Sequence, residues 1–88
     1  MNDKQLEKIL KALANKRRLA ILRFIKKSGR VSVGETAQAI KLSFKATSKH
    51  LMLLGAADIL EKEQVSLTML YFLPKDSHPV VSKILSLL

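Results

Sequence analysis

The pattern of apolar and polar positions predicts two helices in the first third of the chain. The first covers residues 4–14, and its apolar stripe consists of Leu6, Ile9, Leu10 and Leu13. The second covers residues 16–27, with Asn15 as its N-cap and Gly29 at its end. Its inward-facing residues are Ile21, Leu22 and Ile25. Since helices of about three turns are not stable alone, both stripes must pack against other elements.

The next stretch, residues 32–54, predicts two short helices joined by a tight turn. Ser32 and Glu35 form a capping box, in which each side chain accepts a hydrogen bond from the other residue's backbone amide. A second start at Ser43 precedes a helix over residues 44–54, and Gly55 is placed to end it because glycine readily adopts the left-handed conformation. These are the proportions of a helix-turn-helix unit.

The second helix of this unit has two different faces. Thr47, Leu51 and Leu54 share one face at spacings of four and three, so we expect them to be buried. The residues that point away from this face include Phe44, Lys45, Ser48, Lys49 and Met52. A face that mixes hydroxyls and cations is suited to phosphates and base edges.

Beyond this unit the pattern changes from helical to alternating. Residues 59–73 predict a β-hairpin because apolar and polar positions alternate and because Val, Thr, Tyr and Phe favour strands. The turn is expected near residues 63–66. Residues 69–73 are apolar on both faces, which indicates that both faces are covered.

A last helix begins near Ser77 or His78, with Pro79 at an early position that needs no amide partner. Its apolar residues are Val80, Val81, Ile84, Leu85, Leu87 and Leu88, more than a short terminal helix can bury in a monomer. We therefore expect a partner subunit to cover them. The whole pattern predicts a single domain over residues 1–88, mainly α with a small β-hairpin, in the order α-α-(β)-α-α-β-β-α. This is the order of a winged helix-turn-helix domain.

The charge distribution changes the picture more than the composition does. The net charge is +9, and residues 1–50 hold 13 Lys or Arg against 3 Asp or Glu. Residues 51–88 hold 3 basic and 4 acidic side chains. A basic half that contains a helix-turn-helix unit predicts a polyanionic partner. The alternative is a solvated basic surface with no such partner. The absence of cysteine excludes disulfides and thiolate metal sites. The polar start and the short apolar runs favour a cytoplasmic protein.

The residues resemble the ArsR/SmtB-type transcriptional regulators of bacteria and archaea. One segment of the family pattern matches Leu13, Asn15, Arg18, Ile21 and Leu22, and a second matches Leu42, Ser43, Ser48, His50, Leu51 and Leu54. The resemblance covers roughly residues 6–73. It implies a homodimer, joined through its first and last helices, that places two recognition helices in successive major grooves of an operator in double-stranded DNA.

Departures from the family pattern bear on metal binding. Metal-sensing members carry a Cys-x-Cys pair where this chain has Ser32 and Gly34. Asp76 and His78 match half of a zinc site found in other members, but no second half is present, and helix capping explains them better. We expect no metal, no cofactor and no identifiable small-molecule effector.

The expected DNA contacts fall into groups. Lys45, Ser48 and Lys49 are the leading candidates, with Ser43 and Phe44 beside them and Lys62 on the wing. Arg17, Arg18 and Lys41 are expected to hold phosphates and set orientation. Arg17 and Arg18 lie in the first turn of a helix, where cations oppose the helix dipole unless an anion is present. Ordinary solvation explains Arg17 and Arg18 equally well. The sequence leaves two roles for His50: a contact with DNA, or a partly buried, hydrogen-bonded residue.

The predicted dimer interface comprises Leu6, Ile9, Leu10, Leu13, Val80, Val81, Ile84, Leu85 and Leu88. No catalytic arrangement of residues is recognisable, so we do not expect an enzyme. The predicted function is a homodimeric, sequence-specific regulator of transcription, a repressor. The alternative is a winged-helix module that binds another protein through its apolar hairpin and last helix, with incidental basic charge. A third option is a winged helix that binds RNA.

Overall fold

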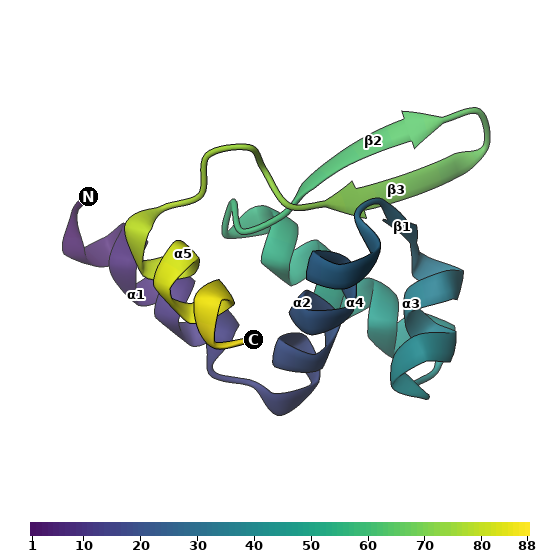
Figure 1. The fold of residues 1–88 in the computed structure, drawn as a ribbon, viewed down its shortest axis with the longest axis horizontal. Coiled ribbons are helices and arrows are strands. Elements are labelled where there is room, and N and C mark those ends of the chain that lie inside the picture. Colours follow the sequence, from purple (N-terminus) through teal and green to yellow (C-terminus); the bar gives the residue numbers. More distant parts are fainter.

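The computed structural model describes all residues, 1–88, and is mainly helical (Figure 1). The helices are α1 (Asp3–Leu13), α2 (Lys16–Ser28), α3 (Val33–Ile40), α4 (Phe44–Ala56) and α5 (Pro79–Leu87). The strands are β1 (Val31–Ser32), β2 (Glu61–Val65) and β3 (Thr68–Phe72). This order confirms the predicted winged helix-turn-helix arrangement. No helix is long and apolar enough to cross a membrane.

Local capping residues set most of the helix boundaries. The side chain of Asn15 accepts a hydrogen bond from the amide of Arg18 at 3.0 Å, which confirms the predicted start of α2. Gly29 ends α2 with a φ of 88°. The first helix begins slightly earlier than predicted, because Asn2 and Gln5 form a capping box of their own.

The predicted end of α4 at Gly55 is wrong. The helix continues through Gly55 to Ala56, and Ala57 is its C-cap. Gly55 instead faces the wing, where an added Cβ would lie 3.9 Å from the ring of Tyr71. That distance is an ordinary van der Waals contact, so Gly55 neither terminates the helix nor is required for the packing of α4 against β3.

The strands form one antiparallel sheet in the order β1-β3-β2. Val31 of β1 pairs with Tyr71 of β3, and Val65 of β2 pairs with Thr68 of β3. The hairpin turn thus lies at residues 66–67, slightly later than predicted. The sequence does not mark this turn with a glycine, because Ser66 itself adopts the left-handed conformation with a φ of 57°.

Only one face of β3 is well covered. Tyr71 is buried, and Met69 and Leu73 pack against the core. Leu70 and Phe72 point to the opposite face and remain half-buried. The prediction that both faces are covered is therefore wrong for the outer face, which lies outside the core cluster and is only partly covered, by Arg30 over the ring of Phe72.

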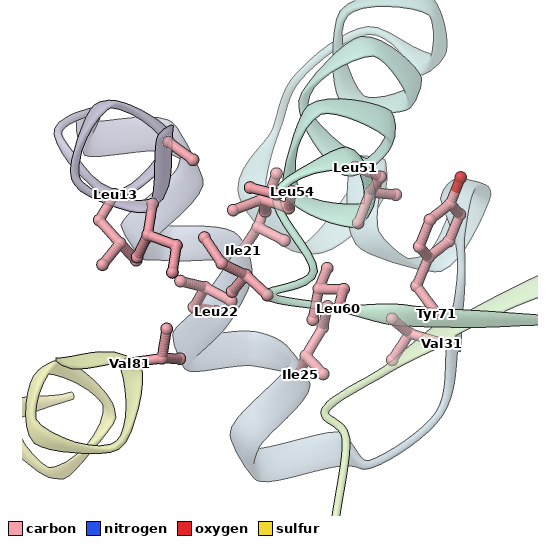
Figure 2. Packing of buried hydrophobic residues seen from close by; sticks show 14 residues of the cluster. Leu13, Ile21, Leu22, Ile25, Val31, Leu51, Leu54, Leu60, Tyr71 and Val81 are labelled. Carbon is pink, nitrogen blue, oxygen red and sulfur yellow. The ribbon is translucent and has the colours of Figure 1, made fainter. Parts of the chain in front are cut away.

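A single cluster of 14 buried hydrophobic residues holds the elements together (Figure 2). Helix α2 lies at its centre: Figure 2 shows Ile21, Leu22 and Ile25 between α1 and α5 on one side and α4 on the other. Leu51 and Leu54 of α4 and Val81 of α5 contribute fully buried side chains. The position of α4 is therefore fixed by the core of the domain.

Candidate nucleic-acid interface

Helix α4 has one buried and one exposed face. Thr47, Leu51 and Leu54 are fully buried, which confirms their predicted role, and Figure 2 shows Leu51 and Leu54 pointing into the core. The other side of the helix exposes Phe44, Lys45, Lys49 and Met52, with Ser48 half-buried beside them. The exposed face thus presents two ammonium groups to solvent.

The connection from α3 to α4 is held by local hydrogen bonds. The capping box is present: the Glu35 carboxylate accepts from the Ser32 amide at 2.9 Å, and the Ser32 hydroxyl accepts from the Glu35 amide at 3.1 Å. These hydrogen bonds hold the pKa of Glu35 below its usual value. Lys41 turns the chain in the left-handed conformation, with a φ of 56°, and Ser43 caps α4 through a 3.1 Å bond from Ala46.

Most of the predicted DNA contacts are accessible to a ligand. The exposed ones are Arg17, Lys41, Ser43, Phe44, Lys45, Lys49 and Lys62. Lys62 of β2 and Met52 of α4 line the same surface groove, which has a volume of about 310 Å³. The root of the wing therefore lies beside the exposed face of α4.

Arg18 does not belong to this exposed set. Its guanidinium is half-buried and donates from Nε to the carbonyl of Ala12 at 2.6 Å and from Nη2 to the carbonyl of Lys11 at 3.1 Å. Both carbonyls lie in the last turn of α1, where the helix dipole is negative. The phosphate contact of Arg18 stays a prediction, and the geometry gives this cation a negative partner within the chain, the C-terminal end of α1.

His50 is the third partner of the same guanidinium. Nη1 of Arg18 lies 3.3 Å from Nδ1 of His50, and because arginine only donates, Nδ1 must be the acceptor. Partial burial, followed by the charges of Arg18 and Arg17, lowers the pKa of His50 below its usual value. Of the two roles left open for His50, the structure favours a neutral residue that links α4 to α2.

The wing is tied to the body by Arg30. Its guanidinium forms an ion pair with Glu63 of β2 and lies 4.1 Å from the ring centroid of Phe72 in β3. One of the two wing glutamates is thereby neutralised. The tip carries no charge, and Leu67 is almost fully exposed there.

An apolar groove lies on the side of the molecule where α1 and α5 are neighbours (Figure 1). It has a volume of about 340 Å³ and is lined only by apolar residues: Leu10, Leu13, Ala14, Leu19, Ile84, Leu87 and Leu88. Leu87 is 78% exposed. An open groove of this composition leaves apolar surface in water unless a second molecule covers it.

The groove changes the list of residues predicted for the dimer interface. Ile9, Leu13 and Val81 are buried in the core of the chain itself, so they have little surface to offer a partner. Leu10 is exposed, and the half-buried members are Leu6, Val80, Ile84, Leu85 and Leu88. Leu19 was not predicted to be covered, and Leu87 was named in the apolar run of the last helix but not in the predicted interface. The apolar run at the end of the sequence was the signal that could have included Leu87.

Several solved structures are similar to this chain, whereas no protein-family model and no curated protein matches it. HlyU from Vibrio cholerae is 32% identical, with 98% of this chain and 86% of HlyU covered and a TM-score of 0.79. The homodimeric winged helix-turn-helix DNA-binding domain of Mb0332 from Mycobacterium bovis, a possible ArsR-family regulator, is 25% identical, with 99% and 82% covered and a TM-score of 0.81. The antimony-specific transcriptional repressor AntR is 29% identical, with 90% and 68% covered and a TM-score of 0.76. This chain belongs to the ArsR/SmtB family of winged helix-turn-helix transcriptional regulators.

In this ArsR/SmtB protein, the positions of the family's Cys-x-Cys pair are used for local structure. Ser32 is the N-cap of α3, and Gly34 lies in the first turn of that helix. His78 is the N-cap residue of α5, but its side chain makes no capping hydrogen bond, so the predicted capping role is wrong for that side chain. Nowhere do three His, Cys, Asp or Glu side chains converge as metal ligands would.

Replacing Arg18 is expected to destabilise this ArsR/SmtB domain. Arg18→Ala would leave the carbonyls of Lys11 and Ala12 and the ring of His50 without their shared donor. Hydrogen bonds to charged groups typically stabilise by about 1.5 to 3 kcal/mol, so we expect a loss of about 2 kcal/mol in the free energy of unfolding. Arg18→Lys should recover less than half, because an ammonium cannot reproduce the planar fork. Urea unfolding at one fixed protein concentration measures both.

Arg17 provides the matched control for this prediction. It is the adjacent residue, carries the same charge, is exposed and forms no hydrogen bond or ion pair. Arg17→Ala should therefore change the free energy of unfolding by no more than about 0.5 kcal/mol. Equal destabilisation by the two alanine variants would contradict the assignment of Arg18 to the end of α1.

Proposed function

We propose that this protein is a homodimeric, sequence-specific regulator that binds double-stranded DNA through α4 and represses transcription by occluding a promoter, in the cytoplasm of a bacterium or archaeon. The exposed face of α4 is the observation that carries the proposal. It presents Lys45 and Lys49 on a helix whose other face is fixed in the core. The homodimeric DNA-binding domain of Mb0332 and the repressor AntR support the assembly and the regulatory role.

The proposed contacts form two groups, one to the phosphates of DNA and one to the edges of its bases. Arg17 and Lys41 are exposed cations at the ends of neighbouring elements and hold phosphates, which position the protein without reading sequence. Phe44, Lys45, Ser48 and Lys49 enter the major groove with α4, since the first residues of a recognition helix reach base edges. Ser43 and Lys62 lie at the edges of this surface. Arg18 and His50 stabilise this surface by linking α4 to α2 and to the end of α1.

The proposed dimer joins the apolar grooves of two copies. Leu10, Leu87 and the half-buried side chains of α5 would be covered, which removes apolar surface from water. A two-fold axis then relates the two α4 helices, which read half-sites about 34 Å apart on one side of the duplex. The operator should accordingly be an inverted repeat. The proposal describes a binding protein rather than an enzyme.

The test is binding of the purified protein to duplex DNA over a series of salt concentrations, together with its mass in solution. About six phosphate contacts would give a slope near −5 in a plot of log affinity against log salt, at about −0.9 per contact. A steep slope and a dimeric mass are the expected results.

Two other outcomes would overturn the proposal. Undetectable or salt-independent binding at low salt would remove DNA as the partner, and the winged-helix module for protein binding would replace it. A monomeric mass at the concentrations where DNA is bound would remove the two-fold arrangement of the recognition helices.

A further inference from the structure

The exposed face of α4 carries an apolar stripe in addition to its lysines. Phe44 and Met52 are 63% and 60% exposed, and they lie eight residues apart with Ser48 between them at equal spacings of four. Residues at this spacing share one side of a helix. The Ser48 hydroxyl lies 4.0 Å from the sulfur of Met52, so these two side chains are neighbours on the exposed face.

Helix α4 lacks the side chains that most often read bases by paired hydrogen bonds. It contains no Arg, Asn, Gln, Asp or Glu. Its remaining polar side chains are largely occupied or unsuited: Thr47 is buried, and His50 is held by Arg18. Only Lys45, Ser48 and Lys49 remain, and lysine contacts guanine O6 and N7 or phosphate through a compact ammonium, without the planar fork of arginine.

The apolar stripe has one complementary group in the major groove. Of the four bases, only thymine presents a methyl group there, on C5. We infer that Phe44 and Met52 contact thymine methyl groups, so that this regulator recognises its operator by the positions of T·A pairs. The inference rests on the proposed function and specifies the sequence class of its DNA.

The length of the stripe limits where those thymines lie. Eight residues of α-helix span about 12 Å, at about 1.5 Å per residue. Base pairs are stacked about 3.4 Å apart. The two contacted methyl groups in each half-site therefore lie within about four base pairs of one another, and the two-fold symmetry repeats them in the other half-site.

The inference can be tested by removing the methyl groups alone. Sites are first selected from a pool of random 30-base-pair duplexes. The selected duplex is then made with thymidine or with deoxyuridine, which differs only by lacking the C5 methyl. Burial of one methyl-sized group corresponds to about fourfold in affinity. With four methyl groups per dimer, we expect the deoxyuridine duplex to bind at least tenfold more weakly.

Substitutions of Phe44 and Met52 test whether these side chains cause the weaker binding of the deoxyuridine duplex. A protein with Phe44→Ala and Met52→Ala should bind the two duplexes with nearly equal affinity, because it lacks the groups that contact the methyls. Leu53→Ala is the matched control: Leu53 is also an exposed apolar residue of α4, but it lines a different pocket together with Lys8 and Lys11 of α1. That variant should retain the full difference. Thermal melts confirm that each variant is folded.

The outcomes separate this inference from the function on which it rests. Tight, selective binding with equal affinity for both duplexes would contradict the proposed contacts with thymine methyl groups, whereas the proposed function as a DNA-binding regulator would stand. A difference that persists in the Phe44→Ala, Met52→Ala variant would overturn the role of the stripe. Failure to select any site or to bind DNA would overturn both proposals.

Discussion

A variant with Lys45→Ala and Lys49→Ala is expected to lose about 100-fold or more in affinity for its DNA at about 0.1 M salt. Both ammonium groups lie on the exposed face of α4, and a dimer presents four of them. Each lost phosphate contact lowers the salt slope by about 0.9, and Arg17 and Lys41 are unchanged in this variant, so the slope should become less steep, but by less than the value of about 3.6 for four lost phosphate contacts. Titration of labelled duplex at several salt concentrations measures both quantities.

The control for this prediction removes the same charge elsewhere. Lys27 lies in the last turn of α2, and Lys75 lies between β3 and α5; both are exposed and form no hydrogen bond or ion pair. A protein with Lys27→Ala and Lys75→Ala has the same net charge as the α4 variant. It should lose little affinity and keep most of its salt slope. If the two variants weaken binding equally, the basic charge acts as a general field and α4 is not the DNA-binding helix.

The helix boundaries were largely predictable because their signals are local. A capping side chain and the amide that it accepts are three residues apart, so Asn15, Ser32 and Ser43 reveal their helices in the sequence. The buried face of α4 was predictable for a similar reason, because its residues recur at helical spacing. Both signals can be recognised in the sequence without knowledge of the tertiary structure.

The role of Arg18 could not be read from the sequence in the same way. Its partners include His50, which is 32 residues away, and carbonyls of α1 whose direction depends on how α1 packs against α2. A cation in the first turn of α2 gave a signal of electrostatic conflict, but the sequence could not say whether DNA or another helix end supplies the negative charge. Only the packing of the helices decides this.

The wing and the apolar groove show a second limit. The hairpin turn was misplaced because Ser66 takes a left-handed conformation that sequence patterns usually assign to Gly or Asn. The surface of α5 was uncertain because every position of its apolar run is compatible with core or interface. The structure separates these roles by burying Val81 and exposing Leu87. The sequence therefore indicated a partner-covered helix without identifying the residues that meet the partner.

Leu87→Glu is expected to separate the proposed dimer and to weaken operator binding by about 100-fold or more. Leu87 is 78% exposed, so its replacement leaves the core of the chain intact, while a carboxylate in the joined apolar grooves would be buried without a partner. A monomer engages only one half-site, and losing the second typically costs about 10²- to 10⁴-fold in affinity. Analytical ultracentrifugation and duplex titration measure the two effects.

Ser82→Glu supplies the matched control, since it adds the same charge to an exposed position of α5 outside the groove. Any repulsion between a new carboxylate and DNA is common to both variants, so the difference between them reports the dimer alone. Ile84→Glu should act in the same direction as Leu87→Glu, but Ile84 also packs against the core, and its effect includes a loss of monomer stability. If Leu87→Glu remains dimeric and binds like Ser82→Glu, then α5 does not join the subunits, and its groove must be covered by a different molecule.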